Sequence, residues 1–147
     1  MDSKLDCLKL ENQLCFPLYA ASKEVIKKYR PFLEELDLTY TQYISMMVLW
    51  QEKSITVKDL GSRLFLDSGT LTPLLKSLET KGLVTRNRSP RDERILIVSI
   101  TESGENLKNK AAFIPEKMAS CINLTKEEAE VLYKILSKIL FSNDSET

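Results

Sequence analysis

Apolar residues in the middle of the chain recur at helical spacing and predict two short helices. The first starts after Thr56, a good N-cap, and carries Val57, Leu60 and Leu64 on one side. Residues 65–67 interrupt the pattern. A second helix then starts with Ser68 as its expected N-cap and ends at Gly82, with an apolar face formed by Leu71, Leu74, Leu75 and Leu78. Two short helices joined this tightly predict a helix-turn-helix.

The opposite side of the second helix is polar. Its expected outer residues are Thr70, Thr72, Lys76 and Ser77. Hydroxyl groups and a cation suit contacts with base edges and phosphates. The pattern therefore indicates a recognition helix for DNA.

A β-hairpin is predicted directly after this helix. Residues 83–86 and 95–100 have the composition of two strands, and the segment between them is polar and basic. Between Arg86 and Arg94, four arginines oppose two acidic residues, which leaves a local charge of +2. Such a hairpin is typical of a winged helix, and arginines at its tip can enter the minor groove. A solvated hairpin beside an ordinary helix pair is less favoured, because helix pair, polar face and basic wing occur together and in order.

Further helices are predicted on both sides of this core. Residues 8–29 should form one helix that bends at Pro17 and ends at Arg30–Pro31, and residues 41–51 should form another. Residues 54–55 could add a third strand beside the wing. Thr101 should cap a helix that runs to about residue 115 and resumes at 118–121. Thr125, with Glu128 in a capping box, should start the last helix, and residues 142–147 should fray.

These elements predict a single domain over residues 1–147 that is mainly α-helical with a small β-hairpin. A winged helix-turn-helix core would span about 32–100, flanked by dimerisation helices at about 8–31 and 101–141. The flanking helices carry more apolar surface than a small core can cover, which predicts a symmetric homodimer. A dimer would place two recognition helices about one helical turn of DNA apart.

Composition narrows the chemistry. Lys and Arg number 21, as do Asp and Glu, so the net charge is +0, which fits a specific DNA-binding protein with its positive charge on one face. The chain has no histidine, which excludes histidine triads and most catalytic zinc sites, and we expect no metal or cofactor. No signal peptide or membrane span is evident, so we expect a cytoplasmic protein in which Cys7, Cys15 and Cys121 are reduced.

Cys15 is the candidate for redox chemistry. It shares a helix face with Tyr29, but 14 positions separate them, about 21 Å along a straight helix. Two such helices crossing antiparallel near Ser22 would bring Cys15 of one chain close to Tyr29 of the other. A phenol hydroxyl that donates to sulfur favours the reactive thiolate. A small buried hydrophobic residue is an equally open interpretation from spacing alone.

Several segments together resemble the MarR family of winged-helix regulators, and within it the organic-hydroperoxide-sensing branch called OhrR. The resemblance spans about residues 10–123 and rests on LENQLCFPLYAASKE, LDLTYTQY, LFLDSGTLTPLLKSLETKGLVTR and the wing sequence RDER before SITESG. It implies a homodimeric repressor that binds an inverted-repeat operator in double-stranded DNA when reduced. The resemblance further implies that an organic hydroperoxide oxidises Cys15 to a sulfenic acid and that the dimer then releases the operator.

The resemblance also implies roles for individual residues. Tyr29 and Tyr40 would hydrogen-bond Cys15 across the dimer, with Tyr19 nearby. In one version of the sensor a small thiol caps the reactive cysteine. In the other, a second cysteine forms an intersubunit disulfide, and Cys121 occupies that position. A buried helix-end cysteine without redox importance is the less favoured alternative for Cys121. Cys7 is expected to be incidental. The DNA-contacting residues would be Ser68, Thr70, Thr72, Lys76, Arg88 and Arg94, with Asp92 positioning Arg94.

Three other functions compete with this prediction. A MarR-type repressor could be released by a noncovalent phenolic or aromatic ligand, bound in a pocket of Tyr19, Tyr40, Tyr43 and Trp50. A thiol peroxidase would need a turnover partner and usually a base, and the chain has neither a histidine nor a CxxC pair, so we do not expect an enzyme. An architectural DNA protein would discriminate weakly between sequences and ignore oxidants.

Overall fold

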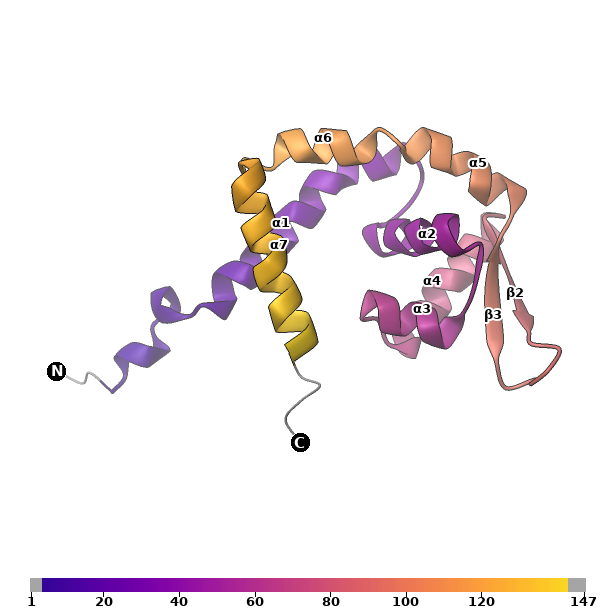
Figure 1. Ribbon diagram of the computed structural model, residues 1–147, viewed down its shortest axis with the longest axis horizontal. Helices are drawn as coiled ribbons and strands as arrows, with labels where there is room; N and C mark the ends of the chain where they lie inside the picture. The colour runs from indigo at the N-terminus through magenta and orange to yellow at the C-terminus, as the bar shows by residue number, and fades with distance from the viewer. Residues whose placement is uncertain (1–3, 143–147) are drawn as a thin grey trace.

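The computed structural model describes residues 4–142 and has the winged-helix architecture expected from the sequence (Figure 1). The wing lies at one end of the molecule and the first described residues of the chain at the other. In chain order the elements are the 3-10 turns η1 (Asp6–Leu8) and η2 (Leu10–Asn12), then α1 (Cys15–Glu34), α2 (Tyr40–Glu52), β1 (Ser54–Thr56), α3 (Val57–Leu64), α4 (Ser68–Thr80), β2 (Val84–Arg88), β3 (Leu96–Ile100), α5 (Glu102–Ala111), α6 (Ile114–Cys121) and α7 (Lys126–Phe141).

The three strands form one antiparallel sheet in the order β1-β3-β2. Thr85 of β2 and Ser54 of β1 both pair with Ser99 of β3, and the hydroxyls of Ser54 and Ser99 lie 2.9 Å apart. The predicted small third strand is therefore confirmed. It anchors the root of the wing to the end of α2, so the wing emerges from a fixed base.

Helix α2 runs through the centre of the core. Met46 and Leu49 on α2 are fully buried, as are Leu60 on α3 and Leu75 on α4. The indole Nε1 of Trp50 donates to the carbonyl oxygen of Gly104 at 2.8 Å, which ties α2 to the first turn of α5. The recognition helix is thus held on a core shared by α2, α3 and the sheet.

The effects that we predicted for two prolines of α1 differ from those in the structure. The helix begins at Cys15 instead of residue 8, and Pro17 lies in its first turn, where a backbone N–H has no partner within the helix in any case. The expected bend at Pro17 is therefore wrong. Pro31 does not end the helix either, because α1 continues through it to Glu34. Its missing N–H costs one hydrogen bond in the last turn, and the burial of Leu33 in the core holds that turn in place.

Most predicted helix caps are confirmed, although the predicted capping box at Thr125 shows only the bond from the Glu128 N–H to Thr125 Oγ1, and one N-cap differs. The side chains of Thr56, Thr101 and Thr125 each accept a hydrogen bond from a backbone N–H of the first turn that follows. For α4, however, the N-cap is Asp67 and not Ser68, because the Asp67 carboxylate accepts from the Thr70 N–H at 2.7 Å. The turn before α4 contains Phe65 in the left-handed region at φ 56°. The expected fraying of 142–147 concerns residues 143–147, which lie outside the described residues.

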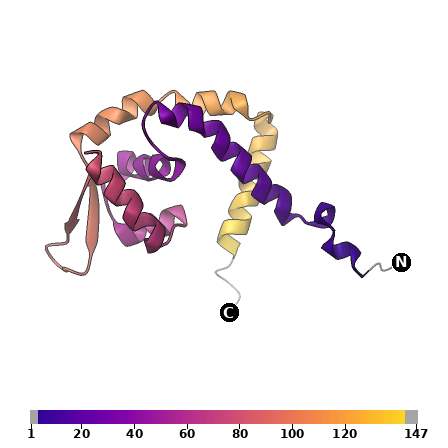
Figure 2. The same ribbon diagram turned by 180° about the vertical axis from the view of Figure 1, so that it is seen from behind.

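The terminal helices expose much of their apolar surface. No residue of α7 is buried, and the exposed apolar side chains include Leu14, Leu18, Ile135 and Ile139. Figures 1 and 2 show α1, α6 and α7 as an arm beside the winged helix-turn-helix unit. Near the end of α7, the Phe141 ring packs 5.8 Å from that of Phe65 in the turn before α4. Within residues 4–142, no helix combines the length and the apolar character that crossing a bilayer requires.

Candidate nucleic-acid interface and redox site

Helix α4 presents a polar face to solvent. Ser68, Thr70, Thr72 and Lys76 are exposed, while its leucines are buried against α2 and α3. Hydrogen bonds from the backbone and side chain of Thr70 lower the pKa of Asp67, which keeps the cap ionised at neutral pH. The hydroxyl of Thr72 donates to the Ser68 carbonyl oxygen at 2.8 Å and retains its lone pairs for accepting. These four side chains lie together, and their contact with DNA stays a prediction.

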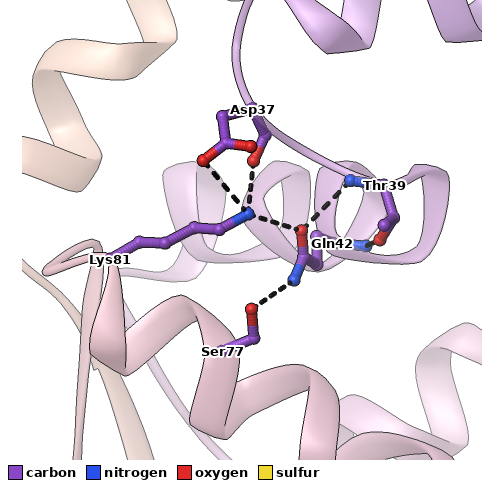
Figure 3. Close-up of polar contacts among 5 residues, drawn as sticks. All are labelled: Asp37, Thr39, Gln42, Ser77 and Lys81. Carbon is purple, nitrogen blue, oxygen red and sulfur yellow. Dashed lines mark hydrogen bonds and ion pairs between the residues drawn. The ribbon is translucent and has the colours of Figure 1, made fainter.

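Ser77 does not belong to this outer face, contrary to the expectation from spacing. Its side chain is half-buried, and its Oγ accepts a hydrogen bond from Gln42 Nε2 of α2 at 3.0 Å (Figure 3). The Gln42 side chain is only 5% exposed. Ser77 therefore holds α4 on the core.

The turn between α3 and α4 depends on a glycine that the sequence pattern did not single out. A Cβ at Gly61 would lie 2.8 Å from the Leu66 carbonyl oxygen and 2.9 Å from Leu71 Cδ1. The Leu66 N–H donates to the Gly61 carbonyl oxygen at 2.9 Å. A side chain here would separate the two helices. The signal in the sequence was a glycine within a helical pattern, which often marks close packing.

The arginines of the wing lie in two different environments. Arg88, Arg91 and Arg94 are exposed. Contact of Arg88 and Arg94 with DNA stays a prediction. Arg86 is half-buried on β2, and it donates to the Glu79 carboxylate of α4 through its backbone N–H at 2.9 Å and through Nη2 at 3.2 Å. Hydrogen bonds from Arg86 lower the pKa of Glu79. This pair joins the wing to the recognition helix, so Arg86 has a structural role.

Asp92 and Arg94 form the pair that the sequence suggested. The Asp92 carboxylate accepts from the backbone N–H of Arg94 at 3.0 Å and from its Nε and Nη2 at 3.1 and 3.2 Å. These hydrogen bonds, with those from the side chain foremost, lower the pKa of Asp92. The Arg94 side chain is 91% exposed, but its hydrogen bonds to the Asp92 carboxylate orient it. It is thus pre-positioned at the base of the wing tip, close to α3.

Cys15 is the first residue of α1, and its side chain is exposed. No hydrogen bond joins it to a tyrosine hydroxyl of the same chain within residues 4–142. That agrees with the 14 positions, or about 21 Å, that separate Cys15 from Tyr29 along the helix. The alternative interpretation of Cys15 as a buried hydrophobic residue does not hold within a single chain. The thiol lies on a surface that a second chain could cover.

Tyr29 of α1 and Tyr40 and Tyr43 of α2 form one aromatic cluster. The Tyr29 ring centroid lies 4.9 Å from that of Tyr40 and 5.8 Å from that of Tyr43. Burial raises the pKa of all three phenols, and the neighbouring tyrosines raise those of Tyr29 and Tyr43 further. Their hydroxyls therefore stay protonated at neutral pH and can donate hydrogen bonds. The proximity of Tyr29 and Tyr40, residues that the family resemblance had linked, was not derivable from helical spacing.

The remaining candidate residues lie apart from this cluster. Tyr19 is 60% exposed on α1, with the Lys23 ammonium 5.2 Å from its ring centroid. Cys121 is exposed at the end of α6. Cys7 is exposed in η1, where its thiol donates to the Lys4 carbonyl oxygen. Residues 4–142 contain no cluster of three or more acidic or cysteine side chains that could hold a metal ion.

A pocket of about 340 Å³ opens between α2 and α5. Tyr43, Trp50 and Met47 line it from α2, and Ala111 and Pro115 lie on its other side. Tyr19 and Tyr40, which we had grouped with Tyr43 and Trp50 as pocket residues, do not line it. The pocket is of a size that small ligands use.

The family model and the curated relatives that match this chain are all transcriptional regulators. Residues 22–111 match the family model described as transcriptional regulator SarA/Rot. The chain is 48% identical to the organic hydroperoxide resistance transcriptional regulator of Bacillus subtilis, over 95% of this chain and 92% of that protein. It is 47% identical to the regulator SarZ of Staphylococcus haemolyticus, over 91% of each chain.

Solved structures of AbfR, from Staphylococcus epidermidis, share the fold. Reduced AbfR bound to DNA superposes with a TM-score of 0.76 at 35% identity, over 95% of this chain and 97% of AbfR. Overoxidised AbfR bound to DNA gives a TM-score of 0.75 at 36% identity, over 93% and 96%. A disulfide form of AbfR gives a TM-score of 0.63 at 38% identity, over 90% and 96%.

Proposed function

Because the chain belongs to the SarA/Rot and MarR-type winged-helix transcriptional regulators, we propose that it is a homodimeric repressor controlled by oxidation. In its reduced state it binds an inverted-repeat operator. When an organic hydroperoxide oxidises Cys15, it releases that operator. The observation that carries the proposal is the exposed thiol of Cys15 at the start of α1, in a chain 48% identical to an organic hydroperoxide resistance regulator.

The exposed apolar surface of the terminal helices supports the dimer. Apolar side chains on α1 and α7 that are left in water would be covered by the same helices of a second chain. If two copies of α1 cross antiparallel near Ser22, Cys15 comes close to the partner's Tyr29. Tyr40 packs on Tyr29, so the partner's Tyr40 reaches the same place. Two protonated phenols would then donate to the sulfur and favour its thiolate.

The chemical step is a two-electron oxidation of sulfur. The Cys15 thiolate attacks the terminal oxygen of the hydroperoxide, an S–O bond forms and the O–O bond breaks. The sulfenic acid remains on Cys15, and the organic fragment leaves as an alkoxide that takes up a proton to become an alcohol. A second thiol then displaces the sulfenic oxygen as water and forms a disulfide. That thiol is a small cellular thiol or Cys121 of the partner subunit.

DNA binding would use the exposed face of α4 and the wing. Ser68, Thr70, Thr72 and Lys76 would lie in the major groove, and Arg88 and Arg94 would follow the adjacent minor groove. Asp92 would keep Arg94 oriented. The even charge balance of the whole chain supports binding through this basic face in preference to nonspecific coating.

Replacement of Cys15 with serine tests the proposal. Operator affinity is measured by fluorescence anisotropy before and after one equivalent of cumene hydroperoxide per subunit. We expect the Cys15→Ser variant to bind like the reduced wild type and to stay bound, whereas the wild type releases DNA. A variant that still responds would refute the thiol mechanism and favour a ligand in the Tyr43–Trp50 pocket.

Three further measurements sharpen this test. A titration of the oxidant is needed, since AbfR has been captured on DNA in an overoxidised form, and excess peroxide could bypass the releasing state. Peroxide consumption should stop at about one equivalent per subunit, as expected for a sensor, whereas continuing turnover would indicate a peroxidase. Non-reducing electrophoresis of the wild type and a Cys121→Ser variant distinguishes an intersubunit disulfide from a mixed disulfide with a small thiol.

A further inference from the structure

Gln42 of α2 links the tyrosine cluster to the recognition helix through a polar network that is centred on its own buried side chain (Figure 3). The network contains the α1–α2 connection, the first turn of α2 and the last turn of α4. None of its members is among the residues that we predict to contact DNA. Its position between the two candidate sites is the basis of the inference that follows.

The first step of the link is the cap of α2. Tyr40, which packs on Tyr29, is the first residue of α2 and directly follows the N-cap Thr39. Thr39 and Gln42 form a reciprocal capping box, in which the Gln42 N–H donates to Thr39 Oγ1 at 3.3 Å. In return, the Thr39 N–H donates to Gln42 Oε1 at 3.1 Å. Any displacement of the Tyr40 backbone is therefore imposed on the Gln42 side chain.

The second step joins that side chain to α4. Gln42 Nε2 donates to Ser77 Oγ at 3.0 Å, and Gln42 Oε1 also accepts from the Lys81 ammonium at 3.2 Å. Lys81, at the C-terminal end of α4, also donates to the Asp37 carbonyl oxygen and pairs with the Asp37 carboxylate. The Gln42 amide is thus bonded at both its oxygen and its nitrogen and is 5% exposed. Independent movement of α2 or α4 would leave buried polar atoms without partners, which is costly.

We propose that Gln42 is a positioning residue that transmits the state of the tyrosine cluster to the recognition helix. When oxidation at Cys15 displaces Tyr29 and Tyr40, the capping box moves with α2, and Gln42 carries α4 out of register with the DNA. The inference rests on the proposed function. To that function the inference adds the path by which oxidation reaches α4. It also adds Gln42, a residue that is placed in contact with neither the thiol nor the DNA.

The test compares operator affinity in the reduced and oxidised states for matched variants. Ser77→Ala removes a hydroxyl inside the network, and Thr80→Ala removes one from the same helix end that bonds only to its own helix, at the Lys76 carbonyl oxygen. Gln42→Met keeps the side-chain length and removes the three polar contacts of the side-chain amide, while the backbone N–H can still donate to Thr39 Oγ1. Gln42→Glu keeps acceptors for Thr39 and Lys81, and Ser77 can donate to it. Trapping of the sulfenic acid with a dimedone probe verifies that each variant is oxidised equally.

We expect the ratio of oxidised to reduced dissociation constants to fall by about 2- to 30-fold in Gln42→Met and Ser77→Ala. The ratio should stay at the wild-type value in Thr80→Ala and Gln42→Glu. A merely structural role would weaken binding in both states alike and leave the ratio unchanged. If Gln42→Met does not fold, Ser77→Ala decides the outcome.

Two failures remain distinct. A wild type that keeps its DNA after oxidation contradicts the proposed function itself. A wild type that releases DNA, together with Ser77→Ala and Gln42→Met variants that release it with an unchanged ratio, overturns the role of Gln42 and leaves the proposed function intact.

Discussion

Substitution of Gly104 with alanine probes how closely the wing is packed on α5. A Cβ at this position would lie 2.3 Å from the Leu83 carbonyl oxygen and 2.7 Å from Ile100 Cγ1. The first obstacle is a backbone atom that already accepts a hydrogen bond from the Thr101 N–H at 3.1 Å, so it cannot rotate away. The start of α5 would have to move by about 1 Å to restore an ordinary contact distance.

The expected cost follows from this geometry. Overpacking in a tight interior costs about 1–3 kcal/mol, and alanine recovers at most about 1 kcal/mol through its higher helix propensity. The movement would also disturb the hydrogen bond from Trp50 Nε1 to the Gly104 carbonyl oxygen. We therefore expect Gly104→Ala to lower the free energy of unfolding by about 2 kcal/mol. With a typical urea dependence, the midpoint would fall by about 1 M.

The assay is urea unfolding followed by circular dichroism, at one fixed protein concentration because association stabilises a dimer. Gly69→Ala is the matched control, since a Cβ there meets only an Asp67 carboxylate oxygen at 3.4 Å. It should be neutral or stabilising by up to about 1 kcal/mol. A Gly104→Ala variant as stable as wild type would refute the close packing of wing and α5.

Two further predictions concern the wing. Arg94→Ala should weaken operator binding by about 1–3 kcal/mol and reduce the salt dependence of that binding, because an exposed, oriented guanidinium is lost. Unchanged affinity in a gel-shift titration would show that Arg94 does not contact the operator. The Arg86 side chain lowers the pKa of Glu79 below its ordinary 4.5, so their pairing stabilises the fold above that pH and is lost as the pH falls through the lower folded-state pKa. The difference in unfolding free energy between wild type and Glu79→Gln should be constant near neutral pH and shrink in acid, and a constant difference at all pH values contradicts this assignment.

Local signals explain why so much of the fold was predictable. The caps at Thr56 and Thr101 and the leucine face of α4 depend on residues within one or two turns. Pro17 misled the prediction because a proline suits the first turn of a helix as well as a bend, and only the true helix start decides. Asp67 and Ser68 are adjacent and equally good caps, and the choice depends on which side chain reaches the Thr70 N–H.

The parts of the candidate site that escaped prediction involve contacts between distant segments. Gln42 and Ser77 are 35 positions apart, and nothing in the pattern around either residue indicates that they meet. Helical spacing places Ser77 on the outer face of an isolated α4. In the folded chain Ser77 instead accepts a hydrogen bond from Gln42 on α2 and is half-buried. Contact between Cys15 and a tyrosine belongs to a second chain and stays a prediction.

The packing of Phe141 on Phe65 has a practical consequence for anyone who labels this protein. A protein or tag fused after α7 would lie beside the turn that precedes the recognition helix α4. A bulky fluorophore or affinity tag at that end would contact the turn before α4. It would therefore disturb the recognition helix whose motion it is meant to report. Reporters are better attached at the opposite terminus, where η1 and η2 stand clear of the wing.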